Sequence, residues 1–211
     1  MKRITLAWTG ASGLAYGLRL LDCLLGAGCR IDLLVSSAAR IVARQELDLG
    51  LPAAPAELAG FLKARFPDRA GELRAYGREE WFAAPASGSN PADAMVVCPC
   101  TMGSLAAIAH GLADNLIERA ADVMLKERRP LILVPRETPF SLIHLRNMTQ
   151  LAEAGATILP ANPGFYHRPE SVDQVVDFIV ARILDQLRVG HTLMARWGES
   201  EPATDDKSAK S

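Results

Sequence analysis

Small and hydroxyl-bearing residues recur in this sequence wherever a short apolar run ends. Glycine lets a backbone N–H approach a ligand closely, and a hydroxyl adds a hydrogen bond to a phosphate oxygen. A helix that begins at such a turn also favours an anion at its N-terminus. The same residue types are ordinary helix caps, so one turn alone does not separate the two interpretations. Three turns of this kind are Gly10, Ala11 and Ser12; Ser36; and Thr101, Met102, Gly103 and Ser104.

Charged side chains occupy three further positions of interest. Arg136 and Glu137 come just after the apolar run Leu131–Val134, which places them near a ligand cleft if that run is a strand. A surface ion pair would look the same in the sequence. Lys126 closes a helical pattern, where a cation complements the helix dipole. Arg182 lies just off the apolar stripe of the last helical segment, as a solvated side chain would.

Two local features fit less easily into an ordinary fold. Glu46 ends a helical pattern, where the dipole disfavours an acid, and such misfits sometimes mark sites. The segment 163–169 places Tyr166 among other aromatic and basic residues between two prolines. It is either a lid that supplies phosphate contacts or a rigid connector.

The sequence offers no metal site and no Ser-His-Asp set. The four histidines are scattered without metal-ligand spacing, and the four cysteines form no Cys-x-x-Cys pair. We therefore expect reduced thiols in an intracellular, cytoplasmic protein. The cysteines are Cys23, Cys29, Cys98 and Cys100, and the histidines are His110, His144, His167 and His191.

Short apolar runs alternate with helical patterns, which predicts an α/β fold. We expect a three-layer, Rossmann-like (flavodoxin-like) open parallel sheet with helices on both faces. The carboxyl ends of parallel strands meet at one edge, so the hydroxyl-bearing turns would gather there and favour a phosphate ligand. Residues 52–92 are the least clear part. Predicted strands are Ile4–Trp8, Ile31–Val35, Ala94–Val97, Leu131–Val134 and Thr157–Leu159, and the best helix is Ser171–Leu187, with a capping box of Ser171 and Gln174.

Composition narrows the class of protein further. The chain has 211 residues, 22% of them charged, with a net charge of -1, so it offers no electrostatic case for nucleic acid or an anionic membrane as the main partner. No apolar run is long enough to span a membrane. We expect one FMN-binding domain over residues 1–197 and a disordered polar tail over 198–211. The first turn is not a G-x-G-x-x-G fingerprint and no acid closes the second strand, so FMN fits better than NAD.

Taken together, the turns resemble those of the UbiX-type flavin prenyltransferases. The resemblance runs from residue 3 to about residue 197. It is carried by Thr9–Gly13, Val35–Arg40, Pro99–Leu105, His110–Leu116, Arg119–Val123, Leu125–Leu131, Arg136–Pro139 and Phe165–Pro169.

The resemblance implies a reaction and a set of residues. Family members join the dimethylallyl group of dimethylallyl phosphate to N5 and C6 of reduced FMN, without a metal. A UbiD-type decarboxylase then uses the product, for example in ubiquinone synthesis. The implied flavin contacts are Gly10, Ala11, Ser12, Ser36, Thr101, Met102, Gly103, Ser104 and Arg136. The implied prenyl-phosphate contacts are Lys126, Arg136, Tyr166 and Arg182, with Trp81 near the prenyl group and Ser12, Glu46, Lys126 and Glu137 as catalytic candidates.

The resemblance also implies a homo-oligomer, often a dodecamer, with sites shared between subunits. Two other functions stay open at this point. An FMN-dependent decarboxylase of cysteine-like carboxylates shares the region Ala109–Leu116, but it typically has Pro-Ala-Met-Asn where this chain has Pro135–Thr138, and an early histidine that this chain lacks. A non-catalytic flavin carrier would explain the turns but would leave Lys126, Tyr166 and Arg182 without a role.

Overall fold

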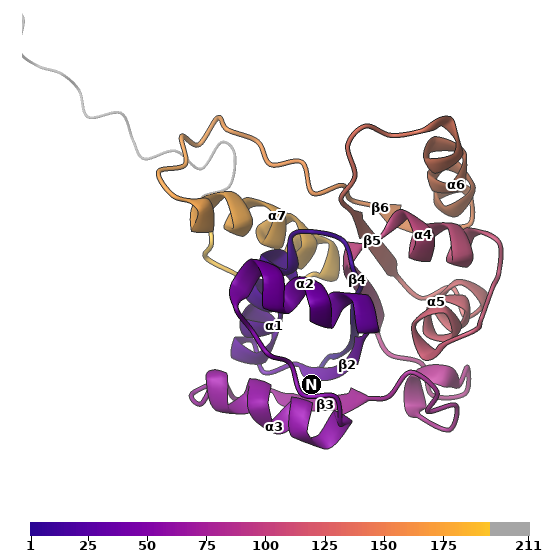
Figure 1. Ribbon diagram of the computed structural model, residues 1–211, viewed down its shortest axis with the longest axis horizontal. Helices are drawn as coiled ribbons and strands as arrows, with labels where there is room; N and C mark the ends of the chain where they lie inside the picture. The colour runs from indigo at the N-terminus through magenta and orange to yellow at the C-terminus, as the bar shows by residue number, and fades with distance from the viewer. Residues whose placement is uncertain (195–211) are drawn as a thin grey trace, which may run out of the picture.

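Six parallel strands form the centre of the computed structural model, which describes residues 1–194 (Figure 1). Their order across the sheet is β3-β2-β1-β4-β5-β6. This order reverses direction between β1 and β4, as in a Rossmann-like fold. The α/β prediction is therefore confirmed. The strands are β1 (Arg3–Trp8), β2 (Arg30–Val35), β3 (Glu72–Tyr76), β4 (Ala94–Cys100), β5 (Leu131–Pro135) and β6 (Thr157–Ile158).

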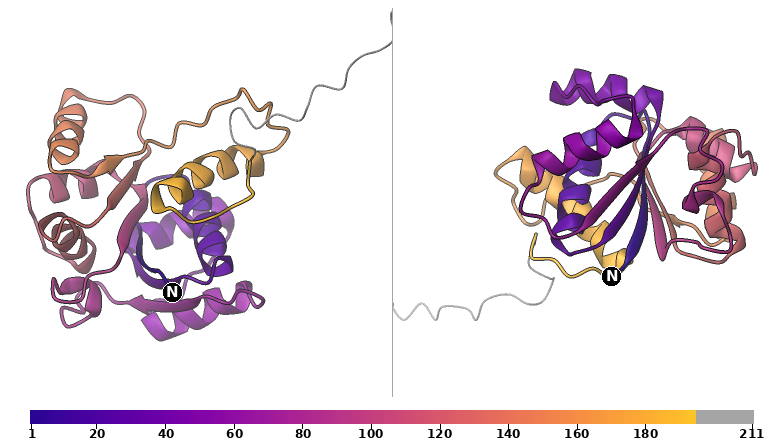
Figure 2. Two further views of the ribbon diagram at one scale, coloured as in Figure 1. Left: turned by 180° about the vertical axis from the view of Figure 1, so that it is seen from behind. Right: turned by 90° about the horizontal axis from the view of Figure 1, so that it is seen from below.

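Helices cover both faces of the sheet and create two apolar cores. Viewed from below, the sheet stands between the two helical layers (Figure 2). The first core packs α1, α2, α3 and α7 onto one face, and the second packs α4, α5 and α6 onto the other. The helices are α1 (Leu14–Gly26), α2 (Ser37–Leu47), α3 (Pro55–Arg65), α4 (Met102–Ala109), α5 (Leu116–Lys126), α6 (Leu142–Glu153) and α7 (Val172–Leu187), with a short 3-10 turn at Ala84–Ala86.

The central strands are largely apolar because they are covered on both sides, but β2 carries a charged residue that is fully buried. Asp32 in β2 is fully buried. Its carboxylate lies 2.5 Å from Arg3 Nε and accepts a hydrogen bond from the Tyr76 hydroxyl at 3.2 Å. A buried carboxylate is tolerated because both oxygens have partners.

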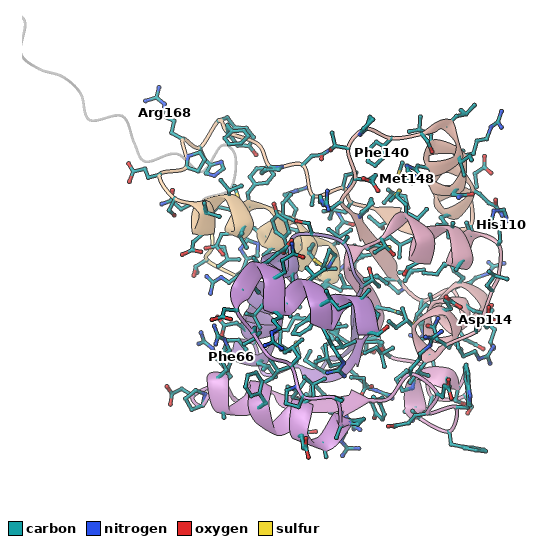
Figure 3. The ribbon with its side chains drawn as sticks, viewed as in Figure 1. Phe66, His110, Asp114, Phe140, Met148 and Arg168 are labelled. Atoms are coloured by element: carbon teal, nitrogen blue, oxygen red, sulfur yellow. The ribbon has the colours of Figure 1, made fainter. Side chains whose placement is uncertain are left out.

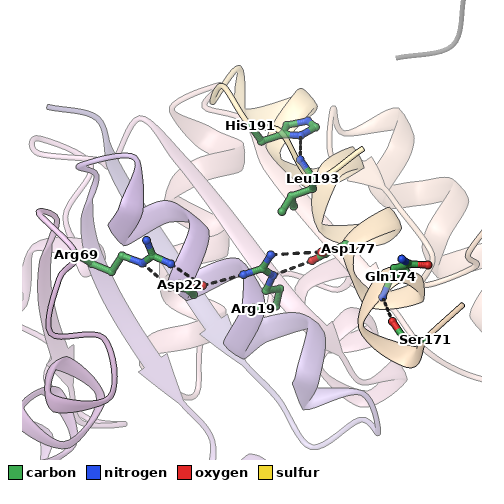
Figure 4. A network of polar contacts seen from close by, with 8 residues as sticks. All are labelled: Arg19, Asp22, Arg69, Ser171, Gln174, Asp177, His191 and Leu193. Carbon is green, nitrogen blue, oxygen red and sulfur yellow. Dashed lines mark hydrogen bonds and ion pairs between the residues drawn. The ribbon is translucent and has the colours of Figure 1, made fainter. Parts of the chain in front are cut away.

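A chain of ion pairs fastens α7 to α1 (Figure 4). Arg19 of α1 lies 2.7 Å from Asp177 of α7 and 2.9 Å from Asp22 of its own helix. Asp22 also meets Arg69, at 2.7 Å. Because the four charged groups form three consecutive ion pairs, the network restrains α7 more than an isolated surface pair would.

Sequence-based predictions fail in the structure at two places. The strand β3 was missed, since it lies in the unclear region 52–92. The capping box predicted for α7 is half wrong: Ser171 accepts from the Gln174 N–H at 3.3 Å, but Gln174 Oε1 accepts from the Glu170 N–H instead. A complete capping box occurs at α6, between Ser141 and His144.

Two further expectations concern the extent of the domain and membrane spans. The expected polar tail, residues 198–211, and the end of the expected domain lie outside the described residues. Across residues 1–194, no helix has both the length and the apolar character needed to cross a membrane.

Candidate active site at the carboxyl edge of the sheet

The turns after β1 and β4 are joined directly, at the point where the strand order reverses. The Thr9 hydroxyl donates to the Pro99 carbonyl at 2.8 Å and accepts from the Thr101 N–H at 2.8 Å. Ligands of open α/β sheets bind in the crevice at such a point. Direct hydrogen bonds thus join two of the three predicted hydroxyl-bearing turns.

The turn after β4 leaves backbone donors available at the start of α4. Thr101 Oγ1 accepts from the Ser104 N–H at 3.0 Å, and the Thr101 carbonyl accepts from the Leu105 N–H. The amides of Met102 and Gly103 in the first turn are therefore left for a ligand. Gly103 is exposed, and an added Cβ would have only Thr101 Oγ1, at 3.9 Å, within 4 Å. This open approach suits a flat or anionic group.

The turn after β2 shows that the capping interpretation is also correct. Ser36 Oγ accepts from the Ala39 N–H at 3.0 Å, as an N-cap of α2. Gly10 has a packing reason too, because an added Cβ would lie 2.4 Å from Ala38 Cβ. Ala11 is buried, so it can offer a ligand only its backbone. These residues shape the site, and the amides of the first turn of α2 remain as donors.

Glu46 occupies the N-terminus of α1, which corrects the expectation that this helix end is open to a ligand. Its Oε2 accepts from the Gly13 N–H at 2.9 Å and from the Leu14 N–H at 3.2 Å. Partial burial raises the pKa of Glu46, but hydrogen bonds from Ser12, Gly13 and Leu14 and the positive charge of Arg136 together bring the pKa below its ordinary value. These interactions favour the ionised carboxylate. The C-terminus of α2 disfavours a negative charge at Glu46, but the positive N-terminal end of the α1 dipole stabilises it.

Arg136 reaches this group from β5. Its Nε donates to the Ser12 carbonyl at 3.3 Å, so Ser12, Glu46 and Arg136 form one cluster. Glu137 Oε1 accepts from the Thr138 N–H at 3.1 Å and stabilises its own turn. Arg136 is half-buried, which strengthens its interaction with an anion relative to a fully exposed cation.

A small cavity of about 160 Å³ adjoins the same edge. Ser36 and Ser104 line it, together with Arg78 and Asn115, which the sequence did not single out. Arg78 lies in the unclear region 52–92, and Asn115 is the N-cap of α5. The cavity places an exposed cation beside two hydroxyls.

Lys126 lies at the opposite edge of the sheet in a single chain. It ends α5, which leads into the start of β5, whereas Arg136 follows the end of β5. The strand between them spans about 16 Å at 3.3 Å per residue. Lys126 Nζ lies 2.6 Å from Glu127 Oε1 and packs against Gly88, where an added Cβ would be 2.4 Å from Nζ.

A groove of about 880 Å³ opens at that same amino edge. Leu125, Arg128, Arg129 and Lys2 are among its lining residues, but none of the hydroxyl-bearing turns is. Although this groove is larger, we do not assign it to the flavin. Helix C-termini converge there, and the carbonyl groups at a helix C-terminus disfavour an anion such as the flavin phosphate.

The remaining predicted ligands are spread over the surface. Trp81 is 44% exposed in the turn after β3. Arg182 is on the solvent side of α7, 2.9 Å from Asp185. Tyr166 lies in the loop after β6, with its ring edge-on to Phe178 at 5.8 Å. One chain therefore brings together most of the residues expected to contact the flavin, but not the full set expected for the prenyl phosphate.

Replacing Glu46 with glutamine tests its capping role. We expect the free energy of unfolding at pH 7 to fall by about 0.5 kcal/mol, because a charge at a helix N-terminus contributes about 0.3–1 kcal/mol. The native pKa of Glu46 lies below its ordinary value of 4.5, so this stabilisation is present above that value and is lost as the pH falls through the native pKa. Urea unfolding at pH 7 and at about pH 3 measures both.

The matched control is Glu79→Gln, at an exposed carboxylate with no side-chain hydrogen bond among the described residues. It should change stability at neither pH. A loss for Glu46→Gln that persists unchanged at low pH would show that packing, rather than charge, explains the effect.

Comparison with known proteins decides the family. The family model named Flavoprotein matches residues 1–184. The flavin prenyltransferase UbiX of Pseudomonas aeruginosa is 55% identical over 205 residues, covering 97% of this chain and 98% of the relative. The chain belongs to the UbiX family of flavin prenyltransferases. The UbiX protein of Alkalihalophilus pseudofirmus is 46% identical over 198 residues, covering 94% of this chain and 97% of the relative.

Solved structures agree with this family. The crystal structure of AnUbiX in complex with FMN and dimethylallyl pyrophosphate has a TM-score of 0.84 and 38% identity, covering 95% of this chain and 99% of that one. A dodecameric FMN-dependent UbiX-like decarboxylase from Escherichia coli O157:H7 has a TM-score of 0.79 and 37% identity, covering 90% and 96%. The cysteine decarboxylase TvaF, at 20% identity and a TM-score of 0.57, shares the fold alone.

Proposed function

We propose that this chain transfers the dimethylallyl group of dimethylallyl phosphate to N5 and C6 of reduced FMN. Family membership supports the reaction, and the AnUbiX structure contains FMN and dimethylallyl pyrophosphate. The observation that carries the assignment here is the edge where β1 and β4 end. Two helix N-termini, an open wall at Gly103 and the half-buried Arg136 meet there, and they suit a phosphate-bearing flavin.

The residues at this edge offer hydrogen-bond donors that suit the phosphate of FMN. Free amides in the first turns of α2 and α4 suit its phosphate, as do the hydroxyls of Ser36 and Ser104 beside the small cavity. Bound reduced flavin supplies the nucleophilic N5 and C6. Among the described residues, no group of three or more His, Cys, Asp or Glu side chains could hold a metal ion, and the proposed step uses none.

The leaving phosphate needs cations as the ester C–O bond breaks and its electron pair moves to oxygen. Arg136 supplies one from the flavin side, and Lys126, Tyr166 and Arg182 are the further donors we propose. An aromatic wall such as Trp81 stabilises the cation-like allylic fragment.

Bond formation at C6 also requires removal of a ring proton, and Ser12, Glu46 and Glu137 are the proposed relay. Because the hydrogen bonds of Glu46 keep it ionised, it is suited to accept a proton or to stabilise positive charge. Ser12, whose hydroxyl bonds Glu46, lies between that carboxylate and Arg136.

The distance between Lys126 and Arg136 makes oligomerisation part of this proposal. Two groups on opposite edges of one sheet cannot hold one phosphate, so we infer that Lys126 enters the site of a neighbouring subunit. The UbiX-like neighbour from Escherichia coli O157:H7 is dodecameric, and an assembly of that kind would give each site residues from more than one chain. We further propose a cytoplasmic location and a UbiD-type decarboxylase as the user of the product.

A mass measurement tests the reaction. Purified protein incubated anaerobically with reduced FMN and dimethylallyl phosphate should yield a flavin heavier by one dimethylallyl unit. Protein that binds FMN but never produces this mass would support a flavin carrier instead. Release of carbon dioxide from a cysteine-like carboxylate, with no heavier flavin, would support the decarboxylase.

A further inference from the structure

A tight turn presents two aromatic rings side by side in the loop between β6 and α7. The Arg168 N–H donates to the Phe165 carbonyl at 3.0 Å, which makes Tyr166 and His167 the two central residues of the turn. Arg168 has a left-handed φ of 52°, and its side chain points outward, away from the body of the molecule (Figure 3). The turn therefore directs Tyr166 and His167 differently from Arg168.

Both rings rest on one side chain of α7. The His167 ring is stacked on Phe178, with centroids 5.5 Å apart and planes at 13°. The Tyr166 ring meets His167 edge-on at 5.9 Å and Phe178 edge-on at 5.8 Å. The backbone closes in beside them, because a Cβ at Gly164 would lie 2.9 Å from the Tyr166 ring and 3.1 Å from the Phe178 ring.

His167 contributes a flat surface to this cluster and no hydrogen bond. Both ring nitrogens are buried, and neither has a hydrogen-bond partner within residues 1–194. Buried polar atoms usually have partners, but these two nitrogens have none among the described residues. Hydrogen bonding therefore does not explain how the ring is held. Its contacts with Phe178 and Tyr166 do. Tyr166 itself is 60% exposed, so one side of its ring is fixed while the rest faces outward.

We propose that His167 is a positioning residue for prenyl transfer, whose ring, stacked on Phe178, holds Tyr166 in the orientation that meets the prenyl phosphate. The inference rests on the proposed function, in which Tyr166 is a phosphate donor. The His167 ring acts through Tyr166 alone. Loss of the ring removes one of the two aromatic contacts that orient Tyr166, which weakens capture of the donor without changing the proposed flavin contacts.

The test compares His167→Ala, His167→Phe and Tyr166→Phe in prenylated-flavin formation from reduced FMN and dimethylallyl phosphate. His167→Ala should raise the KM for dimethylallyl phosphate about 10-fold, with kcat and the Kd for FMN little changed. His167→Phe should stay within about twofold of the wild type, because it retains the flat ring. In the Tyr166→Phe background, His167→Ala should have almost no additional effect, since residues that act as a unit are non-additive.

Three results would overturn the inference. Equal damage from His167→Phe and His167→Ala would show that the imidazole nitrogens matter. Additive losses in the double variant would show an effect independent of Tyr166, and a loss of FMN binding in His167→Ala would show general misfolding. An inactive wild-type chain in the same assay would instead contradict the proposed function, on which this inference depends.

Discussion

Lys126→Ala is expected to reduce prenylated-flavin formation by about 10³-fold, since a cation on a leaving phosphate contributes several kcal/mol to the transition state. FMN binding should remain within about twofold of the wild type, because we assign Lys126 to the prenyl phosphate, whereas the proposed flavin contacts are backbone amides and hydroxyls of the turns after β2 and β4. Single-turnover mass analysis measures the first quantity, and quenching of flavin fluorescence measures the second. Arg129→Ala is the matched control, as it removes a nearby exposed cation from the same turn.

Mixing two inactive variants tests whether the site is shared. Arg136→Ala should also be inactive. Co-refolded Lys126→Ala and Arg136→Ala chains should recover about one quarter of wild-type activity, because random assembly pairs an intact Lys126 with an intact Arg136 in that fraction of sites. No recovery, in an assembly of normal size, would mean that the two residues act within one chain. An active Lys126→Ala variant would instead mean that Lys126 has no part in the reaction.

Gly103→Ala is expected to raise the Kd for FMN by about 10-fold or more, because a methyl group at an open helix N-terminus occupies space that the flavin would use. The protein itself should not be destabilised. An added Cβ has only Thr101 Oγ1, at 3.9 Å, within 4 Å, and alanine is favoured over glycine by about 1 kcal/mol inside a helix. Flavin titration of the apo protein, with urea unfolding of the same sample, measures both effects.

Gly60→Ala provides the control for that substitution. Gly60 is exposed within α3, and nothing lies within 4 Å of an added Cβ. It should gain similar stability and bind FMN like the wild type. If both variants bind FMN equally well, the start of α4 is not a flavin contact, and the assignment of Met102 to Ser104 to the cofactor fails.

The layered architecture was predictable because burial on both faces leaves its mark on each strand. Uniformly apolar runs such as Leu131–Val134 have few alternatives to a covered parallel strand. The edge strand β3 carries no such pattern, since Glu72 and Arg74 interrupt it, and it was missed. Strand pairing with β2 stabilises it, and pairing is a non-local interaction that a local pattern does not reveal.

The gathering of the turns was likewise predictable, since parallel strands end at one edge. Their capping bonds were not. Ser36 and Thr101 bond to backbone amides of their own helices, and a sequence cannot separate that use from ligand binding.

Two residues depend on contacts far apart in the chain. Glu46 looked misplaced at the end of α2, and the explanation is the N-terminus of α1, 33 residues earlier. Lys126 and Arg136 are ten positions apart and belong together in the family resemblance, yet β5 separates them across the sheet. Residue type and local periodicity set the chemistry available to this chain, but the direction in which each helix crosses the sheet determines which of those groups can meet, and that direction is fixed by packing between distant segments.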